Sequence, residues 1–252
     1  MNAIASLSTT PGPRLSESSR LVKTFFAPTE VFHSLRQNPH WRAPWLLISA
    51  FSLVFSFIFL SRIDLLHFAQ METAKSEKAE QIFERLSPAA QQAQLKFSAA
   101  VYKTAAYLAP AITILEAALV AFPLTFAFNF FFKSKIRYSL GMAVVFYASL
   151  PQILFTIITC VALARSPDPD SFDLQNPIAS NPAFFMNPAD HAFLYGLARG
   201  LDVGNIWMIV LLGIGFAAVS EDHNLGRGVS MALVAALYIL FVIARVAVAG
   251  LF

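Results

Sequence analysis

The sequence predicts an all-α, polytopic transmembrane helix bundle with five spans, its N-terminus in the cytoplasm and its C-terminus outside. Hydrophobic residues make up 57% of the 252-residue chain and charged residues only 13%, with a mean hydropathy of +0.60. A soluble domain carries about a quarter of its residues as charged ones. The apolar residues also gather in five long runs, each near the roughly 20 residues that cross a bilayer as a helix.

The chain before the first apolar run divides into two parts. Residues 1–24 begin rich in Ser, Thr and Pro without an apolar period, and we expect a disordered cytoplasmic tail. Residues 25–43 are expected to be an interfacial amphipathic segment. Pro28 begins a short helix whose apolar positions share one face, which favours a helix lying in the headgroup plane. Those positions are Val31, Phe32 and Leu35.

Residues 44–252 are the predicted membrane domain. Because the backbone in lipid must satisfy its own hydrogen bonds, the apolar runs should be helices. The expected spans are about 44–61, 106–132, 140–164, 204–219 and 229–251, with a helical polar stretch at 62–105. Ser87-Pro88 predicts a helix start within the polar stretch. That helix should run on to Phe132, with kinks at Pro110 and Pro123.

The placement of Lys and Arg sets the expected orientation, because short cytoplasmic loops carry an excess of these residues. The turn at 133–137 is basic, whereas the connection at 166–198 holds no Lys or Arg. The two loops agree if the N-terminus is cytoplasmic and an odd number of spans leaves the C-terminus outside.

Six short runs of the sequence resemble stretches of a known family. They are Phe26–Phe32, Asn38-Pro39 with Trp45, Tyr147–Pro151, Phe172–Pro177, Leu201–Trp207 and Gly213–Ala217. On these runs the chain is similar to a bacterial member of the Yip-domain family, the Ypt/Rab-interacting integral membrane proteins. The resemblance implies five spans, a cytosolic N-terminus and no enzymatic activity, and a bacterial member would lie in the cytoplasmic (inner) membrane. Eukaryotic members are linked to Rab-type GTPases, but the sequence alone supports no GTPase partner.

No pattern in the sequence predicts catalytic residues, a cofactor or a metal site. The five His residues lie in loops or at interfaces, and none belongs to an HExxH pattern. No Ser or Cys in a span has a His or Asp at a comparable depth to activate it. The basic residues are spread among loops, which argues against nucleic-acid binding. We therefore do not expect an enzyme.

Two ionisable residues deep within apolar runs are the candidate site. Glu116 lies in the second span and Arg245 in the fifth, each about 17 residues, or roughly 25 Å, from the cytoplasmic end of its helix. A charge inside a membrane is costly, and it marks a functional hypothesis by default. The two residues are a hypothetical intramembrane charge pair. They can serve a transport or proton site, or they can be structural, paired or snorkelling to the outer interface.

Small residues recur at four-residue spacing in three spans, which permits close helix approach. The positions are Ala117 and Ala121, Gly213 and Ala217, and Gly228, Ala232 and Ala236. Packing within the bundle and homodimerisation are both compatible with this spacing.

These features lead to one functional prediction and one alternative. We expect a non-enzymatic integral membrane protein that organises or scaffolds membrane proteins or lipids through its N-terminal segment and polar loops. Its expected partners are the lipid bilayer and other membrane proteins or a second copy. The alternative is a small transporter or channel with Glu116 as an intramembrane ionisable site. Transporters often carry helix breaks at matching places in two repeats, but the prolines here lie in the second and third spans without a counterpart in the fourth and fifth.

Overall fold

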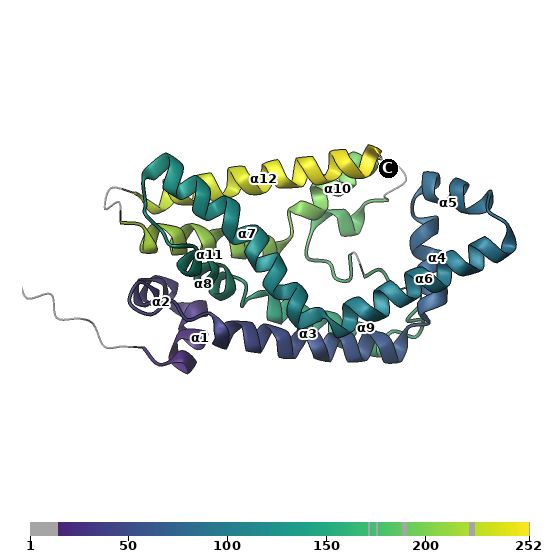
Figure 1. The fold of residues 1–252 in the computed structure, drawn as a ribbon, viewed down its shortest axis with the longest axis horizontal. Helices are drawn as coiled ribbons and strands as arrows, with labels where there is room; N and C mark the ends of the chain where they lie inside the picture. The colour runs from purple at the N-terminus through teal and green to yellow at the C-terminus, as the bar shows by residue number, and fades with distance from the viewer. Residues whose placement is uncertain (1–14, 171, 175, 188–190, 222–224, 252) are drawn as a thin grey trace, which may run out of the picture.

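The structure, a computed structural model, describes residues 15–170, 172–174, 176–187, 191–221 and 225–251. Over these residues it is all-helical and contains no strand, which confirms the predicted all-α class (Figure 1). The helices are α1 Glu17–Phe26, α2 Pro28–Leu35, α3 Arg42–Arg62, α4 Leu65–Ala74, α5 Glu77–Glu84, α6 Pro88–Tyr107, α7 Ala109–Phe132, α8 Tyr138–Ala148, α9 Gln152–Arg165, α10 Ala192–Gly200, α11 Val203–Val219 and α12 Arg227–Leu251, with a short 3-10 helix at Pro182–Phe185.

Three helices are long and apolar enough to cross a membrane alone, and two bent pairs bring the candidate spans to five. The single helices are α3, α7 and α12. The bent pairs are α8 with α9, at 43°, and α10 with α11, at 53°. The first break falls at Pro151, which lacks the backbone N–H that would continue the helix. The second break was not predicted, and it gives the fourth span a counterpart to the break in the third.

The N-terminal segment differs from the sequence prediction. Only residues 1–14 of the predicted tail lie outside the described part of the chain, and α1 already begins at Glu17. Arg20 fixes this helix, because its buried guanidinium donates to the carbonyl oxygens of Ser34, at 3.3 Å, and Asn38, at 3.2 Å. The expectation of disorder over residues 17–24 is therefore wrong. Composition does not reveal these contacts, since the partner oxygens belong to the backbone.

The apolar face of α2 also lies inside the protein. Val31, Phe32 and Leu35 are fully buried, and α2 packs against α11 and α8. The prediction of a short helix with one apolar face was right, but that face contacts the bundle rather than lipid. α1 and α2 thus close one end of the core (Figure 1).

The same end of the bundle is joined by two loops far apart in the sequence. The hydroxyl groups of Ser134 and Ser220, both buried, are 2.8 Å apart. The backbone N–H of Glu221 donates to the carbonyl oxygen of Ser134 at 3.2 Å. These contacts attach the turn between α7 and α8 to the end of α11.

Close helix packing in the core depends on glycine in α11. A Cβ atom at Gly213 would lie 2.8 Å from the backbone Cα of Met231 in α12. The Ser230 hydroxyl donates to the Gly213 carbonyl at 2.6 Å across the same contact. This small-residue position therefore serves packing within the bundle. By contrast, Gly228 has no atom within 4 Å of such a Cβ.

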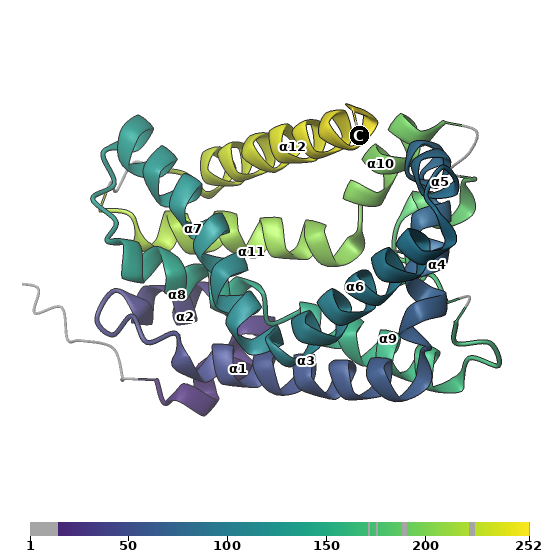
Figure 2. The same ribbon diagram turned by 45° about the vertical axis from the view of Figure 1, so that its right-hand side comes forward.

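The polar stretch 62–105 folds as helices α4 and α5 and most of α6. Aromatic rings in edge-to-face contact hold its base: the ring centroid of Phe68 lies 5.6 Å from that of Phe59 and 5.1 Å from that of Tyr102. Lys75 contacts Glu72 at 2.5 Å and Asp173 at 3.0 Å. Burial lowers the pKa of Lys75, but its bonds to the two carboxylates outweigh that effect and raise the pKa. Figure 2 shows α4 and α5 standing at the opposite end of the molecule from α1 and α2.

The helix start at Ser87-Pro88 is confirmed, because the Ser87 hydroxyl accepts from the backbone N–H of Ala90. We predicted one helix that runs on to Phe132 with a kink at Pro110, but the structure has two separate helices. The first ends at Tyr107, and the second begins with Pro110 in its first turn. α7 then continues through Pro123 without a break.

Candidate functional site

Three cavities with common walls lie between the spans. The polar cavity, of about 370 Å³, is enclosed by α9, α10, α11, α12 and the connection before α10. The apolar cavity, of about 400 Å³, lies among α7, α11 and α12. The side cavity, of about 340 Å³, lies mainly among α3, α7, α8 and α9. Asn205, Tyr238 and Phe241 line both the polar and the apolar cavity. Gln152 lines the polar and the side cavity. Glu116, Val120 and Met208 line the apolar and the side cavity.

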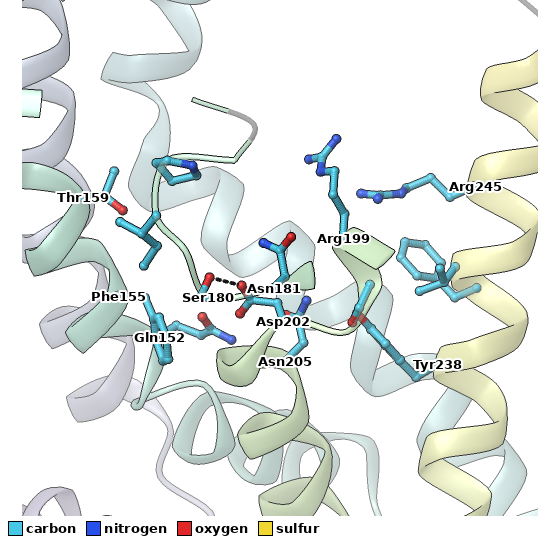
Figure 3. A pocket seen from close by; sticks show the side chains of 15 residues that line it. Gln152, Phe155, Thr159, Ser180, Asn181, Arg199, Asp202, Asn205, Tyr238 and Arg245 are labelled. Atoms are coloured by element: carbon cyan, nitrogen blue, oxygen red, sulfur yellow. Dashed lines mark hydrogen bonds between the residues drawn. The ribbon is translucent and has the colours of Figure 1, made fainter. Parts of the chain in front are cut away.

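The polar cavity lies at the break between α10 and α11 and reaches Gln152, the first residue of α9. Asp202 opens α11, and its carboxylate accepts from the backbone N–H of Gly204 at 2.8 Å and from the hydroxyl of Ser180. The backbone N–H of Val203 donates to the Ser180 carbonyl at 3.0 Å. The connection between α9 and α10 is therefore attached to the start of α11. Figure 3 shows Ser180 and Asp202 meeting at the floor of the cavity.

Glycine brings the surrounding helices close together. A Cβ at Gly204 would lie 2.9 Å from the side-chain oxygen of Gln152, so α11 approaches α9 through this position. A Cβ at Gly200 would lie 3.0 Å from Val242 of α12. The Tyr238 hydroxyl donates to the Gly200 carbonyl at 2.8 Å, which fixes the end of α10 against α12.

The charge of the polar cavity comes from three side chains. Arg199 and Arg245 reach toward one another from α10 and α12, while Asp202 lies lower on the wall (Figure 3). The Asp202 carboxylate already accepts the two hydrogen bonds given above. Among the described lining residues, two arginines and one aspartate give one net positive charge. Guanidinium groups recognise carboxylate and phosphate oxygens in bidentate geometry, so the cavity suits an anionic group.

Each of the two predicted site residues lines a cavity, but they do not meet. Glu116 lies where the apolar and side cavities adjoin, and Arg245 lies in the polar cavity. Among the described residues, no ion pair joins them. The charge pair therefore stays a hypothesis, and a direct salt bridge does not account for either position.

We expect the stability losses of Glu116→Gln and Arg245→Gln to add within about 0.5 kcal/mol, because separate cavities leave the two side chains without a direct contact. A double-mutant cycle on unfolding in detergent measures the coupling. A coupling above about 1 kcal/mol would mean that the two charges pair within the bilayer, and would restore the sequence hypothesis.

Sequence reasoning missed most of the polar lining. Gln152, Asn205 and Tyr238 are uncharged, so they do not stand out within apolar runs as Glu116 and Arg245 do. Arg199 belongs to α10, which was not predicted. The signal that could have found them is a polar residue beside a helix break, as Gln152 follows Pro151. Among the described residues, no group of three His, Cys, Asp or Glu side chains could hold a metal ion.

One family model matches the chain. This model, described as the Yip1 domain, matches residues 22–248. No curated protein and no solved structure matches the chain significantly. The matched residues include α2 through α11 and nearly all of α12, and therefore all three cavities.

Proposed function

The chain belongs to the Yip1 domain family of membrane proteins, and from this premise we propose that it is a non-enzymatic scaffold of the bacterial cytoplasmic membrane. It binds other membrane proteins through the arm formed by α4, α5 and the first turns of α6, with its N-terminus in the cytoplasm. One observation carries the proposal: α5 contacts α4 but makes no extensive contact with any span. A helix that does not serve the packing of the bundle is available to a partner.

The surface of α5 suits a polar partner segment. Glu80, Gln81 and Glu84 are exposed, together with the apolar side chain of Ile82 at 62%. The sequence also suggested the N-terminal segment as a contact surface. However, the apolar face of α2 is buried in the core. The arm is therefore the stronger candidate of the two.

A photocrosslinking residue at Gln81 should form discrete adducts with another membrane protein in cells. Replacing Glu80 and Glu84 with Lys should abolish those adducts while leaving thermal stability unchanged, because both side chains are exposed. The same crosslinker at Val248, on the exposed side of α12, is the control and should give no such adduct. Adducts only between copies of this chain would indicate self-association, and no adduct at Gln81 would refute the scaffold.

The proposed orientation can be tested by thiol labelling. In a Cys160→Ala background, Gln92→Cys and Arg137→Cys each place one exposed thiol, in α6 and at the start of α8. An impermeant reagent added outside intact cells should label position 92 and spare position 137, because the basic turn belongs to the cytoplasm. The opposite pattern would reverse the orientation.

A small transporter or channel remains the second candidate function, and one observation favours it. Helix breaks occur in two bent pairs, and the polar cavity is lined by Gln152, directly after the first break, and by Asp202, at the second. Discontinuous helices around a site near the membrane centre are a feature of transporters. Glu116 would be the intramembrane ionisable site. A proton-dependent flux in liposomes that is lost in Glu116→Gln would establish this function, and no flux in the unmodified protein would exclude it.

A further inference from the structure

We propose that the polar and apolar cavities together bind one anionic phospholipid, with its phosphate at Arg199 and Arg245 and an acyl chain between α7 and α12. This site lies among the spans, away from the arm. The lipid proposal therefore does not depend on the proposed scaffold function. The argument rests on the charge of one cavity, the walls of the other and the side chains that join them.

The polar cavity provides for a headgroup. Its net positive charge comes from two guanidinium groups, and its remaining polar side chains include Gln152 and Asn205. Arginine pairs with phosphate oxygens through two parallel hydrogen bonds. The amides can bond to the hydroxyls of a glycerol headgroup. Asp202 keeps its negative charge, but its two oxygens accept from Ser180 and from the backbone N–H of Gly204, which holds the carboxylate at the start of α11.

The apolar cavity provides for a chain. Leucine, valine and phenylalanine side chains of α7, α11 and α12 dominate its wall: Leu119, Val120, Leu124, Leu212, Val234, Leu237 and Phe241. Leu119 on α7 and Phe241 on α12 are 65% and 61% exposed, so the cavity is flanked by side chains that face the membrane. α12 packs on α11 and α10, while α7 packs on α3 and α8. The space between α7 and α12 is thus open to a chain from the bilayer.

Asn205, Tyr238 and Phe241 join the two cavities, because these three side chains line both. A molecule that occupied both would need a charged end and an apolar end in immediate succession. A phospholipid has this form, whereas a soluble phosphate would fill the polar cavity only. The volumes of about 370 and 400 Å³ lie within the usual range of ligand sites.

The test uses the full chain in detergent micelles, with thermal unfolding followed during titration by two lipids of equal chain length. A ligand that binds the folded state raises Tm in a concentration-dependent way. Phosphatidylglycerol should raise Tm at a concentration at least about tenfold lower than phosphatidylcholine. Equal effects of the two lipids would overturn the proposal, and this comparison requires no variant.

Variants and a headgroup analogue locate the site. Arg245→Gln should weaken the response to phosphatidylglycerol by about tenfold or more. Arg165→Gln removes the same charge at an exposed position outside the cavities, so it should keep the full response. Equal losses in both variants would indicate a non-specific charge effect and refute the site. If glycerol 3-phosphate alone raises Tm as effectively as the lipid, the cavity binds a soluble anion and the lipid proposal is wrong.

Discussion

Replacing Phe32 with alanine will destabilise the protein by about 3–5 kcal/mol, which is the usual cost of truncating a buried phenylalanine. The ring is fully buried in the main core. Two of its atoms would lie 3.1 Å from a Cβ at Gly215, so the ring fills the space that the glycine leaves in α11. Its loss leaves a cavity between α2, α8 and α11. Denaturant unfolding in detergent measures the change.

Phe26 supplies the control for this prediction. It belongs to the neighbouring α1 and undergoes the same chemical change to alanine, but its side chain is 85% exposed. Phe26→Ala should therefore alter the free energy of unfolding by less than about 0.5 kcal/mol. If Phe32→Ala were equally mild, α2 would not belong to the core.

Gly213→Val should destabilise the protein by about 3 kcal/mol, the upper part of the usual range for overpacking a core. Even the first added carbon would lie 2.4 Å from the Met231 side chain and 2.8 Å from the Met231 Cα. The side chain can rotate away, but the backbone cannot, so α11 and α12 must separate. That separation also lengthens the hydrogen bond from Ser230 to the Gly213 carbonyl.

Gly228→Val is the matched substitution for this contact. Gly228 lies on α12, the helix that carries Met231, but no atom lies within 4 Å of a Cβ placed there. Replacing a helical glycine removes its conformational cost, so we expect no loss of stability in the same unfolding assay. A similar loss in both variants would show that valine acts through helix propensity and not through the contact with Met231.

The sequence predicted the membrane class and the five apolar segments because a helix in lipid requires a long run of apolar residues with few charges. The predictions failed where single contacts decide the structure. Arg20 is a charged residue in a polar region, yet backbone carbonyls hold it inside the protein. The Asp202 carboxylate at the break accepts from the hydroxyl of Ser180, 22 residues earlier, and no local pattern encodes that partner.

The candidate site was predicted in part for the same reason. Glu116 and Arg245 could be found because an ionised side chain in an apolar run is rare. Their separation into different cavities could not be predicted, because it depends on how α7 and α12 are placed around α11. Helical periodicity gives the face on which a residue lies, but it does not give the neighbouring helix.

The bond between Ser134 and Ser220 has a consequence for stiffness. Together with α1 and α2 it fastens one end of the bundle, whereas the cavities separate the helices farther along. We expect the backbone amides next to this bond to exchange hydrogen more slowly than those of α5, which makes no extensive contact with any span.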